Sequence, residues 1–224
     1  MYDIKTTGSL LAALALAACA TVTRPDPPAP PPTAEQMMKS VVRVEDAMEH
    51  FNHGTGVYVG NGYVLTAAHV AQAWNDRKVV EFHGHRGYWR VEMVWRDAVA
   101  DIALLRVTEV PADVPAARLY CGELRYAQPV TMIGFPIDLP ISVSLGQIMS
   151  PYPHGDDQSI PAAIPTAPGN SGSPVFDTEG RVVGVLSKLV EGAVNGVPYM
   201  FPYGYIAPTT GTVCKALADG SLHN

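Results

Sequence analysis

The chain has 224 residues and a formal net charge of −6. Hydrophobic residues make up 47% of it and charged residues 16%, so it can bury a sizeable core and is not globally disordered. Nucleic acid is not an expected partner, because the chain is acidic and has no cluster of Lys and Arg to bind phosphates. Its 20 Gly and 20 Pro favour short strands joined by turns over a helical protein.

The N-terminus has the layout of a targeting segment. Residues 8–18 are small residues and leucines, a run too short to span a bilayer as a helix but typical of a signal peptide. The run ends in Leu-Ala-Ala-Cys, which resembles the bacterial lipobox, whose cysteine becomes the lipidated first mature residue. We therefore expect a signal peptide over residues 1–18, lipidation of Cys19, and a periplasm-facing anchor in the outer membrane. The alternative is an uncleaved N-terminus with an incidental cysteine.

A proline-rich segment follows. Six of the ten residues in 24–33 are proline, a composition that forms an extended, semi-rigid spacer rather than a core. We expect the lipidated cysteine and spacer to occupy residues 19–36 and a folded domain to occupy residues 37–220.

The domain reads as two sets of short strands. Asn61-Gly62, between two apolar runs, is a tight-turn signal, and a turn-rich stretch over residues 111–129 separates the sets. Residues 210–218 read as a short helix stopped by Gly220. These patterns predict an all-β fold of two packed six-stranded antiparallel barrels, about 37–118 and 128–208, with a short C-terminal helix. The expected strands are 41–44, 56–59, 63–66, 78–82, 88–94 and 102–107, then 130–134, 143–148, 174–176, 182–187 and 199–206.

Three local strings carry candidate chemistry. His69 lies in Thr-Ala-Ala-His-Val at the end of a strand, and Asp101 directly precedes the apolar run Ile-Ala-Leu-Leu. An aspartate in that position is costly unless its charge is used, although Asp97 is a nearby competitor. Ser171 lies in Gly-Asn-Ser-Gly-Ser-Pro, where glycines allow a close approach of the backbone to a ligand.

Together these three motifs resemble those of the chymotrypsin-like (trypsin-fold) serine protease family, both in their amino-acid sequences and in their His–Asp–Ser order along the chain. Their compact spacing is similar to that of bacterial Deg-type proteases. The resemblance implies a serine endopeptidase with Ser171 as nucleophile, His69 as general base and Asp101 as the orienting carboxylate. It also implies that the Gly169 and Ser171 amides form an oxyanion hole, with no cofactor or metal needed, and that proteins or peptides are the substrates.

Two departures from the family matter. Asn170 stands where trypsins carry the aspartate that pairs with a newly cut N-terminus, so we do not expect activation by N-terminal insertion. Pro165 replaces the aspartate that selects Arg or Lys, which favours a neutral, small or medium apolar side chain in the primary pocket. We also expect no PDZ domain after the C-terminal helix. By resemblance, the pocket is lined by Pro165, Thr166, Leu186, Ser187, Lys188, Gly204 and Tyr205, and Ser187 lies near Asp101.

Other titratable residues leave alternatives open. If Cys19 is lipidated, Cys121 and Cys214 remain as either a disulfide or two buried thiols. His83 and His85 have no further His or Cys nearby, so a solvated strand edge is favoured over a metal site.

Two other functions compete with the endopeptidase. The barrel fold could serve as a catalytically silent binding module on a lipoprotein, since one fold hosts many functions. The same serine chemistry could also act on esters. The oligomeric state is not encoded in any motif.

Overall fold

The computed structural model describes residues 30–49, 52–73, 77–137, 139–153, 156 and 158–220. From Pro31 onward the chain forms one compact unit. The expected signal peptide, Cys19 and most of the spacer lie outside the described residues. Among the described helices, none has the length and apolar character needed to cross a membrane.

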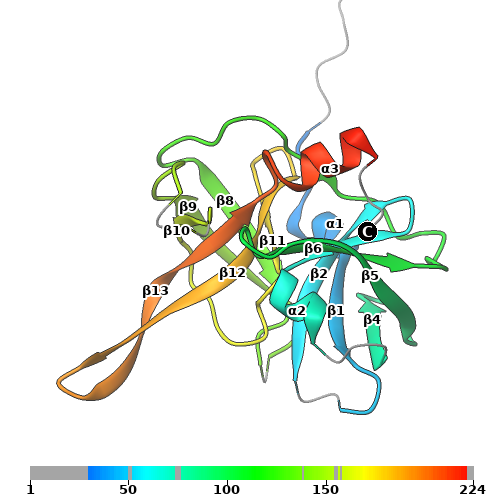
Figure 1. Ribbon diagram of the computed structural model, residues 1–224, viewed down its shortest axis with the longest axis horizontal. Helices are drawn as coiled ribbons and strands as arrows, with labels where there is room; N and C mark the ends of the chain where they lie inside the picture. The colour runs from blue at the N-terminus through cyan, green and yellow to red at the C-terminus, as the bar shows by residue number, and fades with distance from the viewer. Residues whose placement is uncertain are drawn as a thin grey trace, which may run out of the picture. The chain divides into compact units, whose positions relative to one another are not determined.

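The first six strands form a closed barrel in the order β1-β2-β3-β6-β5-β4 (Figure 1). Asn61 and Gly62 both have positive φ, which builds the tight turn between β2 and β3 that their sequence predicts. The strands are β1 (Val41–Asp46), β2 (His53–Gly60), β3 (Tyr63–Thr66), β4 (Lys78–Phe82), β5 (Trp89–Asp97) and β6 (Ile102–Val107).

The second set of strands also closes on itself. Its order is β11-β8-β9-β10-β13-β12, the β11–β12 pairing closes the ring, and β7 adds in parallel to β12. The all-β, two-barrel prediction is therefore confirmed. The strands are β7 (Arg118–Leu119), β8 (Pro129–Gly134), β9 (Ser142–Ile148), β10 (Ile160–Ala163), β11 (Pro174–Phe176), β12 (Arg181–Val194) and β13 (Val197–Pro208).

Several elements were not predicted. Helix α1 (Ala34–Met38) begins three residues before the expected start of the domain, with a capping box between Thr33 and Gln36. Helix α2 (Ala68–Gln72) is a single turn and β10 contains a proline, so neither has a clear periodic pattern. Helix α3 (Val213–Asp219) is the predicted C-terminal helix, and Gly220 ends it in the left-handed conformation.

Alternation along the strands separates three apolar clusters. On β1, Val42 and Val44 face the core of the first barrel, while Val41 faces a cluster between the barrels. That middle cluster joins Leu65 of the first barrel to Phe176 of the second, and both side chains are fully buried. A third cluster fills the second barrel. Burial between the barrels therefore fixes their relative position and brings their loops together.

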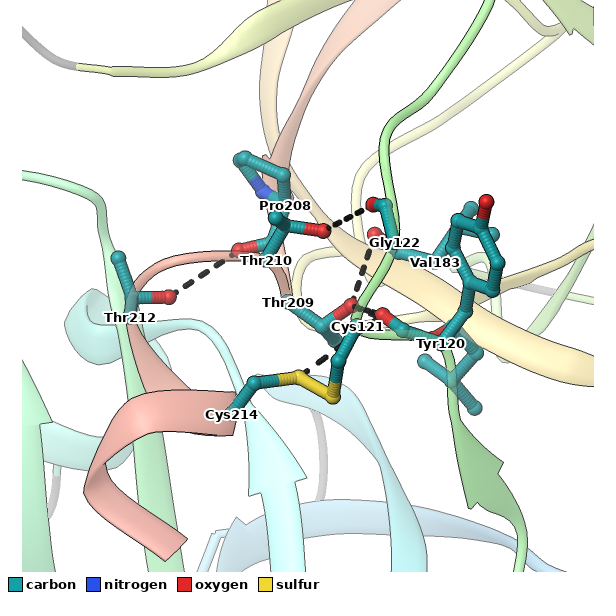
Figure 2. Close-up of a disulfide and its surroundings, with 10 residues drawn as sticks. Tyr120, Cys121, Gly122, Val183, Pro208, Thr209, Thr210, Thr212 and Cys214 are labelled. Carbon is teal, nitrogen blue, oxygen red and sulfur yellow. Dashed lines mark hydrogen bonds between the residues drawn. A yellow bond between two sulfur atoms is a disulfide. The ribbon is translucent and has the colours of Figure 1, made fainter. Parts of the chain in front are cut away.

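A disulfide ties the segment between the barrels to the C-terminal helix (Figure 2). It links Cys121 to Cys214, whose Cα atoms are 5.9 Å apart, and closes a sequence separation of 93 residues. Next to it the buried Thr209 hydroxyl donates to the Tyr120 carbonyl at 2.6 Å, and the Thr210 hydroxyl donates to the Gly122 carbonyl at 2.7 Å. The segment and the chain end are thus held both covalently and by hydrogen bonds.

We expect the Cys121→Ser/Cys214→Ser double variant to lower the free energy of unfolding by about 2–5 kcal/mol, because the unfolded chain regains the freedom of a long loop. Urea unfolding at pH 7 measures the change. Reductant should lower the wild-type midpoint and leave the double variant unaffected. Equal midpoints for oxidised wild type and double variant would contradict the expectation.

Candidate active site

Strand pairing in the first barrel brings His69 and Asp101 together. The end of β3 pairs with the start of β6, with Thr66 opposite Ala103. His69 lies in α2, just after β3, and Asp101 lies just before β6, so the register makes them neighbours despite a sequence separation of 32. The His69 ring Nδ1 lies 2.9 Å from Asp101 Oδ2, and the His69 backbone N–H donates to Asp101 Oδ1 at 3.0 Å.

The Asp101 carboxylate also receives a hydrogen bond from the second barrel. The buried Ser187 hydroxyl, on β12, donates to Asp101 Oδ2 at 2.6 Å. Burial raises the pKa of the Asp101 carboxyl, but the hydrogen bonds from His69 and Ser187 and attraction to the His69 ring outweigh burial and hold that pKa below its ordinary value. A carboxylate held in this way stays ionised and orients the imidazole, whose side chain is 49% exposed.

Asp97, the competing carboxylate, has a local role. Its Oδ1 accepts from the backbone N–H groups of Val99 and Ala100, both at 3.0 Å. It therefore shapes the turn that leads to Asp101, whose own φ is +55°. This left-handed conformation is uncommon outside glycine, and an aspartate tolerates it better than most residues.

The loop that carries Ser171 is pinned from both sides. The Ser171 carbonyl accepts a hydrogen bond from the Thr55 N–H of β2 at 2.8 Å. The Gly172 N–H donates to the Leu186 carbonyl of β12 at 2.7 Å. Gly172 has φ +83°, and a Cβ there would collide with the Thr55 carbonyl oxygen and the Thr66 hydroxyl. Only glycine fits this position. The close approach that it allows places Ser171 next to the segment that leads into His69.

Among residues 169–173, the amides of Gly169 and Ser171 donate no hydrogen bond to the described part of the chain, while those of Asn170, Gly172 and Ser173 donate to carbonyls of the protein. The carbonyl of Pro168 accepts from the Ile137 N–H at 2.8 Å. Since a trans peptide points its N–H and C=O in opposite directions, this bond fixes the direction of the Gly169 N–H. The Gly169 and Ser171 N–H groups are thus available to donate hydrogen bonds to a ligand.

Thr55 organises this loop and was not singled out from the sequence. Its hydroxyl donates to the Gly169 carbonyl at 3.0 Å and accepts from the Phe135 N–H at 3.1 Å. His53, two residues earlier, places Nε2 2.7 Å from the Phe135 carbonyl. The only local signal was a threonine between two glycines on a buried strand, which does not by itself indicate a contact 114 residues away.

The predicted pocket residues fall into two groups. Thr166, Leu186 and Lys188 surround Gly204, where an added Cβ would lie 2.8 Å from the Lys188 carbonyl oxygen and 3.1 Å from Leu186 Cδ1. The Thr166 hydroxyl oxygen is buried and has no hydrogen-bond partner among the described residues. Of the others, Ser187 binds Asp101, Pro165 is exposed, and Tyr205 pairs with Lys188 on β12 and with Pro161 on β10.

The two histidines after β4 contact other groups. His85 Nε2 lies 2.9 Å from Asp113 Oδ1, and the His83 ring lies 6.3 Å from that of Phe135. Burial, with a smaller contribution from the charge of His85, lowers the pKa of His83. Over the residues that can be described, no three His, Cys, Asp or Glu side chains form a group able to hold a metal ion.

The lowered pKa of Asp101 predicts a specific dependence of stability on pH. Because the folded pKa lies below the unfolded one, the ionised carboxylate stabilises the fold above about pH 4, and this contribution is lost as the pH falls through the folded pKa. We therefore expect wild type to lose more unfolding free energy than Asp101→Asn between pH 6 and pH 3, measured by urea unfolding. A difference between the two proteins that does not change with pH would contradict this.

Comparison with known proteins shows which family the chain belongs to. The model of the trypsin-like peptidase domain matches residues 54–185, which include His69, Asp101 and Ser171. Among curated proteins, Protease Do-like 2, chloroplastic, of Arabidopsis thaliana is 32% identical over 165 residues, covering 70% of this chain. Serine protease Do-like HtrA of Bacillus subtilis is 28% identical over 181 residues, covering 73% of this chain. A probable periplasmic serine endoprotease DegP-like of Halomonas elongata is 31% identical and covers 66%.

The chain spans only part of these relatives, 26%, 40% and 32% of their respective lengths. Solved structures agree on the fold. The inactive form of Rv3671c from M. tuberculosis matches with a TM-score of 0.63 at 22% identity, covering 84% of this chain and 89% of that one. A serine endoprotease from Yersinia pestis matches with a TM-score of 0.64 at 22% identity, covering 86% of this chain and 67% of that one. The family match, the barrels and the site geometry agree, and the chain belongs to the trypsin-like peptidase domain family.

Proposed function

We propose that the protein is a serine endopeptidase with Ser171 as nucleophile, His69 as general base and Asp101 as the orienting carboxylate. The observation that carries the proposal is the segment around Ser171, in which the Gly169 and Ser171 amides donate to no described acceptor while those of Asn170, Gly172 and Ser173 are bonded. Two available backbone donors beside a serine are what a tetrahedral oxyanion requires.

The chemistry follows from these groups. Asp101 accepts from His69 Nδ1, which leaves the other ring nitrogen, Nε2, to accept a proton. His69 takes the Ser171 hydroxyl proton as the serine oxygen attacks the peptide carbonyl, and the oxyanion accepts from the Gly169 and Ser171 amides. The protonated His69 then gives its proton to the leaving amine. A water molecule, deprotonated by His69, hydrolyses the acyl-enzyme and regenerates Ser171.

Relatives and sequence favour an envelope location. Several relatives are described as probable periplasmic serine endoproteases, and this chain begins with a signal-like segment that ends at Cys19. We infer that the protein acts in the bacterial cell envelope, held by a lipid on Cys19, on protein or peptide substrates. Palmitate labelling of cells that express wild type or Cys19→Ala tests the anchor.

The experiment that tests the catalytic proposal is labelling of the full-length chain with a fluorophosphonate, beside Ser171→Ala and His69→Ala. We expect label on Ser171 in wild type and at least about a thousandfold loss of peptide hydrolysis in either variant, because the residues act as one unit. Mass spectrometry of the labelled peptide locates the site. No label on folded wild type would overturn the proposal in favour of a binding module, and turnover of esters alone would assign an esterase.

We further propose that the predicted primary pocket, which includes Thr166 and Gly204, accepts a short substrate side chain before the scissile bond. The unpartnered Thr166 hydroxyl costs free energy when buried, and a hydroxyl on the substrate would satisfy it. We expect Thr166→Val, which keeps the shape, to lower the ratio of kcat/KM for a threonine-containing peptide over its valine analogue by about threefold to tenfold. Matched peptides that differ only at that position measure the ratio, and an unchanged ratio would contradict the assignment.

A further inference from the structure

The β12–β13 hairpin extends beyond the second barrel as a two-stranded ribbon. Figure 1 shows it as the orange arm that projects away from the body of the molecule. Beyond Leu186, β12 pairs only with β13 among the described residues, so one backbone edge of β12 from Leu189 to Val194 faces no other strand. Asn195 and Gly196, both with positive φ, form the turn at its tip. An unpaired edge of this length is a template for another extended chain.

One face of this ribbon is apolar and uncovered. The register places Gly192 opposite Tyr199 and Val194 opposite Val197, so their side chains share a face. Val194, Val197 and Tyr199 are 57%, 66% and 50% exposed. Phe201 lies on the same face, with its ring centroid 5.0 Å from that of Tyr199.

Gly192 leaves room for the Phe201 ring to reach across to β12. A Cβ on Gly192 would lie 2.8 Å from Phe201 Cε2, so the absence of a side chain there is what allows the ring to approach. The ring therefore lies over Gly192 on this face of the ribbon. In the sequence from 189 to 203 the only charged residue is Glu191, and it is paired with Met200 on the opposite face.

The free edge is continuous with the site at Ser171. Leu186 exchanges backbone hydrogen bonds with the catalytic loop, accepting from Gly172 at 2.7 Å and donating to Ser173 at 2.9 Å. Ser187, the next residue, holds Asp101. A peptide whose carbonyl lies at Ser171 is therefore beside β12 at the point where the strand leaves the barrel.

We propose that the β12–β13 hairpin is an extended docking strand for substrate, which binds about six residues beyond the immediate cleft by adding a strand to the free edge of β12. The proposal rests on the endopeptidase function. Antiparallel pairing is the more stable arrangement, and β12 runs outward from Ser187 to Val194, so the added strand runs inward and ends at Ser171. The docked segment is thus N-terminal to the scissile bond, and it is an extended, apolar stretch of unfolded protein.

The position of the N-terminal segment favours a peptide over a lipid surface as the occupant. A Cβ on Gly180 would collide with Pro32, so Pro32, in the predicted spacer, lies against the turn before β12. The hairpin tip lies at the other end of this 14-residue strand, roughly 45 Å away at the usual rise per residue. The apolar face therefore lies at the far end of β12 from the chain segment that would lead to the proposed anchor.

The test measures binding without cleavage, with the full-length Ser171→Ala chain in detergent. The probes are a fluorescent octapeptide with threonine before the scissile bond, the same peptide extended at its N-terminus by Val-Thr-Leu-Thr-Val-Thr, and a third extended by those six residues at its C-terminus. We expect the N-terminal extension to lower Kd at least about tenfold and the C-terminal extension to leave it unchanged. Equal Kd values for all three would overturn the proposal.

Two neighbouring residues provide a matched pair of hairpin variants. Phe201→Ser, on the apolar face, should abolish the gain from the N-terminal extension, whereas Met200→Ser, on the opposite face, should retain it. Tyr199→Ser serves as a second variant if Phe201→Ser does not fold. Equal losses from both faces would overturn the proposal. A monomer–dimer equilibrium or binding to vesicles of phosphatidylethanolamine and phosphatidylglycerol that Phe201→Ser alone abolishes would assign the face to a second copy or to lipid instead.

The peptide-binding results can be distinguished from a failure of the proposed endopeptidase function. Binding to Ser171→Ala needs no chemistry, and fluorophosphonate labelling of wild type needs no hairpin. Label on Ser171 with no gain from the N-terminal extension would reject the docking strand and keep the peptidase. Absence of label would reject the peptidase whatever the peptides do.

Discussion

The Asp101 carboxylate joins the two barrels at the point where their loops meet. It accepts from the ring and the backbone of His69 on the first barrel and from the Ser187 hydroxyl on the second. The bond from Ser187 requires the barrels to hold one relative position, and the apolar cluster between them supplies that constraint. The carboxylate then stays ionised because its hydrogen bonds outweigh the cost of burial.

Hydrogen bonds from both barrels also position the loop that carries Ser171. Thr55 of β2 binds the loop through both its backbone N–H and its hydroxyl, while Leu186 of β12 binds it from the other side. The loop is therefore positioned by two strands from different barrels, and glycine at position 172 allows them to approach. Support of this kind fixes the direction of the Gly169 and Ser171 amides, as the proposed oxyanion hole would require before a ligand binds.

Strand β12 links the site to the surface. It contributes Ser187 to the hydrogen bonds of the Asp101 carboxylate, contacts Gly204 in the predicted pocket, and continues into the hairpin. Chemistry, side-chain selection and docking of a longer chain would thus lie along one continuous strand. The disulfide between Cys121 and Cys214 holds the segment between the barrels against the C-terminal helix.

The sequence by itself determined the class of fold and the three strings that carry His69, Asp101 and Ser171. Alternating apolar residues, the Asn61-Gly62 turn and the motif order are local patterns, so they are readable without knowing which segments meet. Strand β10 was missed because it is short and contains Pro161, and the hairpin was predicted too short although Asn195-Gly196 carries the same turn signal as Asn61-Gly62.

Only the tertiary structure decided the contacts between distant segments. Thr55 binds Gly169 across 114 positions and Ser187 binds Asp101 across 86, and no local pattern specifies either partner. The structure also separated Asp97, which caps a turn, from Asp101, because strand register places only the latter against His69. The physical reason is that periodicity reports which face of a strand is buried, whereas the identity of the group across the interface depends on how the two barrels pack.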